Sequence, residues 1–376
     1  MTKLWILLSV CLVIARIIES RDRRMNRYGT HRREHLFTFF LVIILGFFCG
    51  LRTWGNDTGT YLEIYHHLTP TLDQLSPESL WDFSSGIALT YFFSLFKTLG
   101  FSSQDMLMTF AFATSILYVR FVRNYSLSFV FGVFLMFTTG FYTFSLAAIK
   151  QCMATGFCLL AVSAAIERKW VRYVLFVLTA SLFHPYAIIY FVVPLMFFRP
   201  WTNLSYIYIV VFFFAGLYLE TLIGTVIDIT DMMGADYTAD ELMGAGVNIF
   251  RVLVSFVPLI LSFLYRKRLF AASDRTENLM MNLTMLNALI MFVGLFGTAN
   301  YFARLANYFL PAQIIVLPWI LQRLPRRDRV LFYPASVVGY LGYFYYENAI
   351  IRPFDTGYSH MSLWNYLADL FTGGLS

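Results

Sequence analysis

The sequence predicts an all-α polytopic membrane protein, with residues 1–376 forming one integral membrane domain. Of the 376 residues, 59% are hydrophobic and only 13% are charged, whereas about 25% are charged in typical soluble domains. Apolar runs of about 20 residues, the length that a helix needs to cross a bilayer, recur along the chain. The net charge of +6 comes from arginine clusters between these runs. It therefore indicates membrane topology before it indicates any polyanionic partner such as nucleic acid.

The first apolar run, residues 4–18, is expected to be the first crossing, with the N-terminus outside. It does not read as a cleaved signal peptide, because its positive charge follows the apolar run and there is no clear A-x-A site. Arginines crowd the loop after it, which the positive-inside rule assigns to the cytoplasm. They are Arg16, Arg21, Arg23, Arg24, Arg27, Arg32 and Arg33.

The second crossing, about residues 36–50, then exits, so the stretch 50–61 (GLRTWGNDTGTY) faces outward. Its two glycines, Asn and Asp predict a turn rather than more helix. The turn places Arg52 and Asp57 at the end of a membrane-spanning helix. A cation, a carboxylate and aromatic side chains at the edge of a bilayer can form a site for a charged, membrane-tethered substrate.

The extent of the outer segment that follows is determined by the number of membrane crossings between two residues on opposite sides. An odd number of crossings must separate outward Arg52 from inward Arg123, yet two apolar runs lie between them. We assign the short run 87–99 as an interfacial or re-entrant helix and 106–122 as the crossing. Residues 52–105 then form one long outer segment. Further cytoplasmic loops are marked by Arg120/Arg123, Arg168/Lys169/Arg172, Arg266/Lys267/Arg268 and Arg323/Arg326/Arg327/Arg329.

The rest of the chain supplies the remaining crossings, for a total of about twelve with both termini outside. The run 186–198 is short for a span and contains Pro194. Residues 224–249 carry five acidic and no basic side chains, which is typical of an outer loop. The expected crossings are 126–141, 145–167, 171–183, 186–198, 204–223, 250–265, 279–298, 302–322 and 330–346.

The four cysteines suggest neither a disulfide nor a metal site. All of them lie in apolar runs, without a CxxC motif or a metal-ligand spacing. We therefore expect no cofactor, and a divalent metal is not indicated. The four cysteines are Cys11, Cys49, Cys152 and Cys158.

Several ionisable residues at span ends fall on the outer side in this topology. Lys150 and Arg304 lie about a turn inside their apolar runs, where a charge costs about 2.5–3.5 kcal/mol on insertion scales, so both are functional candidates. Asn300, Arg304 and Tyr308 are spaced i, i+4, i+8 and are expected to share one helix face.

Each of these residues also has a plainer interpretation. A lysine or arginine near a helix end can extend its charge to the headgroups, and this is the reading that we favour for Arg251. His184, just before Pro185, can be a hydrogen-bonded histidine at a helix end. What favours a site is that these separate residues fall on one side of the membrane.

The chemistry of this set fits a lipid-linked sugar. Arginine and lysine bind phosphate well, and a neighbouring carboxylate can accept the proton of a sugar hydroxyl. A site at the outer edge of the bilayer can receive a polyprenyl-diphosphate donor laterally. The cations would stabilise charge on the diphosphate leaving group, while Asp57 would activate the acceptor hydroxyl.

Four short elements carry a resemblance to a known family. Their residues are Leu51, Arg52, Asp57 and Tyr61 in LR-x4-D-x3-Y, Lys150, Gln151 and Ala154 in KQ-x2-A, His184, and Ala303, Arg304, Leu305 and Tyr308 in ARL-x2-Y. In this order, over most of the chain, they resemble the EpsG-type family of exopolysaccharide polymerase-like membrane proteins, functional relatives of Wzy polymerases.

The resemblance implies a polymerase of undecaprenyl-diphosphate-linked oligosaccharides, which serve as donor and acceptor in exopolysaccharide, capsule or O-antigen synthesis. It places the site on the periplasmic, outer face of the bacterial cytoplasmic (inner) membrane, among membrane lipids, with a flippase and a chain-length regulator as candidate partners. A GT-C-like arrangement is one option for the fold. The predicted catalytic residues are Asp57 and His184. The predicted diphosphate- or sugar-binding residues are Arg52, Tyr61, Lys150, Gln151, Asn300, Arg304 and Tyr308.

Two departures from the family pattern concern the site. The family usually has arginine where this chain has Lys150, so bidentate phosphate binding is not expected there. An acidic residue followed by Pro or Gly is common after the first motif, and here Glu78 and Asp82 are both imperfect matches.

Three other functions remain as alternatives. A lipid-phosphate-sugar-dependent glycosyltransferase that adds one sugar would share the outer carboxylate and often need a divalent metal. A transporter or flippase of lipid-linked oligosaccharide would place ionisable residues near the bilayer midplane, with repeat symmetry. A membrane acyltransferase would need a His/Asp or His/Ser pair within the spans, which the sequence does not suggest.

Overall fold

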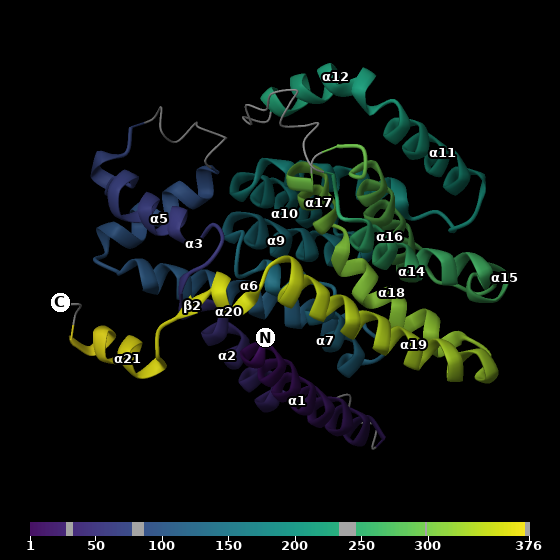
Figure 1. Ribbon diagram of the computed structural model, residues 1–376, viewed down its shortest axis with the longest axis horizontal. Helices are drawn as coiled ribbons and strands as arrows, with labels where there is room; N and C mark the ends of the chain where they lie inside the picture. Colours follow the sequence, from purple (N-terminus) through teal and green to yellow (C-terminus); the bar gives the residue numbers. More distant parts are fainter. Residues whose placement is uncertain (28–32, 77–85, 233–245, 298, 373–376) are drawn as a thin grey trace.

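The computed structural model describes residues 1–27, 33–76, 86–232, 246–297 and 299–372 (Figure 1). These ranges are almost entirely helical, and their strands form a single two-stranded ribbon. The prediction of a helical protein is therefore confirmed. The predicted acidic positions Glu78, Asp82, Asp236, Asp240 and Glu241 lie outside the described residues.

The elements up to the middle of the chain are α1 (Thr2–Arg27), α2 (Leu36–Gly50), β1 (Arg52–Trp54), α3 (Thr58–Glu63), η1 (Ile64–Leu68), η2 (Leu72–Gln74), α5 (Ile87–Thr98), α6 (Ser103–Tyr125), α7 (Phe129–Thr138), α8 (Phe141–Phe144), α9 (Ile149–Ile166), α10 (Trp170–Phe183) and η3 (Pro185–Met196). They are followed by α11 (Asn203–Leu217), α12 (Leu219–Met232), α14 (Ile249–Leu264), α15 (Arg266–Leu269), α16 (Arg275–Val293), α17 (Ala299–Asn307), α18 (Leu310–Arg323), α19 (Arg326–Tyr345), η4 (Tyr346–Ile351), α20 (Phe354–Gly357), β2 (Ser359–His360) and α21 (Leu363–Thr372).

Long apolar helices are consistent with a membrane protein. Among the described residues, α6 and α9 are each long and apolar enough to cross a bilayer, and the number rises to four if two bent helix pairs each count as one span. Several predicted crossings, including α2, α10 and α14, are apolar helices of 10–17 residues. The total of about twelve crossings stays a prediction.

The predicted crossings 126–141 and 145–167 contain α7 and α9, which are both shorter than predicted and are separated by the short helix α8. α7 ends at Thr138, and Gly140 takes a left-handed conformation (φ 83°) that suits glycine. The Thr139 hydroxyl donates to the Leu135 carbonyl (2.6 Å) at the end of this helix. α9 begins only at Ile149, so Lys150 stands in its first turn instead of a turn inside a span.

Three other predicted crossings are also interrupted. The run 302–322 divides into α17 and α18, which meet at a 55° bend just before Pro311, because proline is favoured in the first turn of a helix and not inside one. The run 186–198 forms the 3₁₀ helix η3, with Pro185 at its start and Pro194 inside. The run 204–223 turns by 102° between α11 and α12, and α12 continues to Met232, into the predicted acidic loop.

Clusters of basic residues and the polar motifs around Asp57, Lys150 and Arg304 lie at opposite ends of the helix bundle. At one end, Arg21 pairs with Glu34 (3.1 Å) and Arg123 pairs with Asp22 (3.0 Å), joining α1 to the residues just before α2 and to α6. The Arg268 side chain there donates to the Arg323 carbonyl (2.8 Å), joining α15 to the end of α18. At the other end, α2 leads into β1, and α9, α14 and α18 begin.

The C-terminal segment closes over the first motif, an arrangement that the sequence did not suggest. β1 pairs antiparallel with β2, with Arg52 opposite His360. The Met361 backbone N–H donates to the Leu51 carbonyl (2.9 Å), and the Tyr366 hydroxyl donates to Asp105 (2.9 Å). The end of the chain thus fixes the turn that carries Asp57.

Candidate functional site

The turn that carries Asp57 is stabilised by hydrogen bonds from the buried Arg52 side chain. The Arg52 side chain is 1% exposed. It donates from Nε to the Thr58 hydroxyl (3.0 Å) and from Nη1 to the Cys49 carbonyl (2.6 Å). Asn56, just before Asp57, adopts a positive φ of 46°. Arg52 therefore joins the end of α2 to the start of α3, and the turn between these anchors carries the partly exposed Asp57.

Asp57 meets Arg304 from the far part of the chain. The Asp57 Oδ2 lies 3.6 Å from the Arg304 Nη2, and the two side chains are 30% and 33% exposed. The Asp57 carboxylate makes no side-chain cap to α3, so it is directed to this pair instead of to its own helix. The sequence placed these two residues on one side, and the structure brings them into contact.

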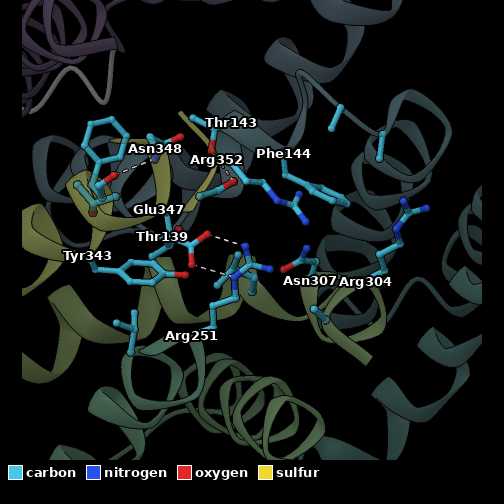
Figure 2. A pocket seen from close by; sticks show the side chains of 18 of the residues that line it. Thr139, Thr143, Phe144, Arg251, Arg304, Asn307, Tyr343, Glu347, Asn348 and Arg352 are labelled. Atoms are coloured by element: carbon cyan, nitrogen blue, oxygen red, sulfur yellow. Dashed lines mark hydrogen bonds and ion pairs between the residues drawn. The ribbon is translucent and has the colours of Figure 1, made fainter. Parts of the chain in front are cut away.

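The pair lies in the wall of a cavity of about 410 Å³ (Figure 2). The break between α7 and α9 contributes Thr139, Thr143 and Phe144 to the wall. Among the lining residues that the structure describes, three are arginines and two are carboxylates, which leaves an excess of positive charge. The charged lining residues are Asp57, Arg251, Arg304, Glu347 and Arg352.

A second ion pair lies across the cavity from the first. Arg251 binds Glu347 with two hydrogen bonds, from Nε (2.9 Å) and from Nη2 (2.5 Å). These two side chains are less exposed than the first pair, at 22% and 13%. The sequence interpretation that Arg251 simply reaches the headgroups was wrong, because its guanidinium is held by Glu347. Figure 2 shows Asn307 between Arg251 and Arg304, with Arg352 directed into the same space.

A family model described as the EpsG family matches residues 35–367. The chain belongs to the EpsG family. This family is related to the Wzy-like exopolysaccharide polymerases, which agrees with the resemblance carried by the short motifs. Neither the search of curated proteins nor the search of solved structures found a match.

Three other motif residues, Gln151, His184 and Tyr308, are not among the residues that line the cavity and instead support Arg304. The Gln151 amide donates to the Arg304 carbonyl (2.6 Å). The Tyr308 hydroxyl and the His184 Nδ1 are 2.8 Å apart, and both residues are buried. Tyr308 is in the bend after α17, so it does not continue the helix face of Arg304 as the i, i+4 spacing predicted. These contacts fix the segment that carries Arg304.

Tyr61 and Lys150 lie next to this buried group. The Tyr61 hydroxyl accepts a hydrogen bond from the Lys150 backbone N–H, and the charges of Lys150 and Arg304 both act on His184. Burial raises the pKa of Tyr61 well above its usual range, so this hydroxyl stays protonated. Asn300 belongs to α17, but its side chain is not part of what the structure describes.

Sequence reasoning missed Asn307, Glu347 and Arg352. Asn307 comes three residues after Arg304, a helical spacing that could have suggested it. Glu347 and Arg352 follow the last apolar run, and only the fold shows that they return to Asp57. Within the described residues, no group of three or more His, Cys, Asp or Glu side chains is placed to hold a metal ion.

Proposed function

We propose that this EpsG-family protein is a polysaccharide polymerase, which joins polyprenyl-diphosphate-linked oligosaccharide repeat units at the outer face of the bacterial cytoplasmic membrane. The observation that carries the proposal is the contact between Asp57 and Arg304 in a cavity with an excess of arginine. A carboxylate next to phosphate-binding groups is what sugar transfer from a diphosphate requires.

The proposed reaction is a displacement at the anomeric carbon of the donor. A hydroxyl of the acceptor sugar attacks this carbon and forms the new glycosidic C–O bond. The bond between the same carbon and the diphosphate oxygen breaks, and polyprenyl diphosphate leaves. Asp57 takes the proton of the attacking hydroxyl, while the arginines stabilise the negative charge that grows on the leaving group.

The remaining residues are assigned by what they contact. Arg304 and Arg352 can bind the diphosphate, since guanidinium binds phosphate by two parallel hydrogen bonds. Arg251, whose Nε and Nη2 bind Glu347, adds its positive charge beside them. Asn307 can hydrogen-bond sugar hydroxyls from the wall between them. Arg52, Gln151, His184 and Tyr308 act as positioning residues, because their side chains bond to the segments that carry Asp57 and Arg304.

The outward orientation is supported by the distribution of charge. Basic clusters gather at the helix ends opposite the cavity, and such clusters remain in the cytoplasm during membrane insertion. The cavity then opens on the outer side, where lipid-linked repeat units are polymerised. No nucleotide is needed, since the diphosphate linkage supplies the leaving group.

The test is polymerisation by the purified protein. The protein in lipid nanodiscs is incubated with a synthetic undecaprenyl-diphosphate-linked repeat unit, and the products are separated by length. The proposal predicts a ladder of products spaced by one repeat unit. With a polyprenyl-phosphate-linked monosaccharide added, a product longer by only one sugar would indicate the single-sugar transferase instead. Transport of the intact lipid across vesicles, without chain growth, would indicate the flippase.

A further inference from the structure

A second hollow lies on the outside of the helix bundle, between α14 and α19. It is an apolar groove of about 530 Å³. Leu253, Val257 and Leu261 form the α14 side, and Phe332, Gly339 and Gly342 are among the residues of the α19 side. Leu253 is 55% exposed. In a membrane protein, an apolar face of this kind borders the lipid chains.

The groove and the charged cavity are continuous. Val254 and Tyr343 line both of them. The Arg251–Glu347 pair stands at the junction, because each of its members follows a groove residue, Phe250 or Tyr346, in the chain. Figure 2 shows the Tyr343 hydroxyl directed toward this ion pair. An apolar channel therefore ends where the arginine-rich cavity begins.

The direction and length of the groove suit a lipid chain. Phe250 and Tyr346 are in contact at the cavity end, with ring centroids 4.8 Å apart and ring planes inclined by 59°. Leu261 lies at the other end, toward the basic helix ends. At 1.5 Å per helical residue, the distance from Phe250 to Leu261 is about 16 Å, which is about half of the 30 Å hydrocarbon thickness of a bilayer. A chain in the groove would thus descend from the outer edge toward the bilayer centre.

The groove is hollow because α19 presents small residues there. A Cβ atom added at Gly339 or at Gly342 would meet nothing within 4 Å. Beneath them, the Tyr340 hydroxyl accepts from the Gln313 amide (2.7 Å) and donates to the Val254 carbonyl (3.2 Å), which joins α18, α19 and α14. The floor of the groove is therefore fixed by hydrogen bonds, and its open space does not come from loose packing.

We propose that this groove binds the isoprenoid chain of the lipid-linked substrate and thereby directs its diphosphate to Arg251 and Arg352. The inference takes its substrate from the proposed function and adds the path by which that substrate enters. Charge supports an anionic lipid, because the groove ends at arginines. Lipid chains are as apolar as the groove itself, so the groove contributes position and shape selection, while the arginines contribute most of the affinity.

The experiment fills the groove without disturbing the fold. Gly339→Leu/Gly342→Leu adds two side chains into open space. The matched control is Gly224→Leu in α12, where an added Cβ also meets nothing within 4 Å. The probe is undecaprenyl diphosphate without sugar, carrying a photoreactive group on its first isoprene units. We measure its affinity for each purified protein and map the crosslinked peptides by mass spectrometry.

We expect crosslinks on α14 and α19, with affinity at least tenfold weaker in the double variant and unchanged in the control. Unchanged affinity in the double variant, or crosslinks on other helices, would overturn the inference. Equal displacement of the probe by phosphatidylglycerol would do the same, since the groove would then be an ordinary phospholipid site.

These outcomes separate this inference from the proposed function. If the wild-type protein forms the product ladder while groove filling leaves probe binding unchanged, the groove inference is wrong and the proposed polymerase function stands. If the probe crosslinks to the groove but the wild-type protein forms no ladder, the groove inference stands and the proposed polymerase function is wrong.

Discussion

Replacing Asp57 by asparagine should separate catalysis from stability. The substitution keeps the size of the side chain but removes the negative charge and the ability to accept a proton. Because the Asp57–Arg304 pair is long (3.6 Å) and each side chain is about one-third exposed, its loss should cost at most about 1 kcal/mol of folding free energy. The loss of a general base lowers a rate by about 10²–10⁴-fold.

The assay combines product length with thermal melting in detergent. Asp57→Asn should form no ladder within the time in which the wild-type protein completes one, while its melting temperature stays within a few degrees. The matched control is Asp73→Asn, an exposed carboxylate in the same predicted outer segment that does not line the cavity. Wild-type product length from Asp57→Asn would remove Asp57 from the reaction, and a loss of folded protein would mean that the pair is structural.

Three further predictions concern the support of the site. Glu347→Ala should lower the free energy of unfolding by about 2 kcal/mol, because it leaves the partly buried Arg251 charge unpaired; a melting temperature equal to that of wild type would count against this pair. Gly55→Ala should loosen the C-terminal segment and lower activity, since a Cβ there would lie 2.1 Å from the Tyr358 ring at a φ of +132°; unchanged protease resistance of that segment would contradict the contact. Burial, together with Lys3 and Arg52, lowers the pKa of His360 to about 4, so stability is full above pH 6.5 and falls by about 1–2 kcal/mol as the pH drops toward 4. Amide exchange in residues 359–372 should report this loss, and His360→Phe should abolish its pH dependence.

The sequence predicted well where several helices begin and end and which helix ends lie at the same end of the bundle. Long apolar runs define α2, α6, α10 and α14 to within a few residues, because hydrophobic burial and backbone hydrogen bonding both require helices in a membrane. Arginine clusters likewise indicated which helix ends lie together. That sidedness placed Asp57 and Arg304 at the same end of the bundle, although the sequence could not tell that they are within ion-pair distance.

What the sequence did not predict depends on breaks and on long-range pairing. The apolar run 302–322 continues through the bend before Pro311, so hydropathy alone merges α17 and α18, which the backbone separates. Hydropathy also extends the crossing 126–141 past Thr138, where α7 ends. Glu347 and Arg352 acquire a role only when the end of α19 returns to α14. The pairing of β1 with β2 involves three and two residues, too few to leave an alternating pattern.

The most direct test of the account is cysteine labelling of the cavity wall from the outside. All four natural cysteines are buried, so a membrane-impermeant thiol reagent reports on an introduced cysteine. Asn307→Cys should react in intact cells and should be protected by undecaprenyl diphosphate, while Lys169→Cys at the basic end should react only in inverted vesicles. Reaction of Asn307→Cys only from the cytoplasmic side, or without protection by the lipid, would contradict an outward-facing site for lipid-linked sugars.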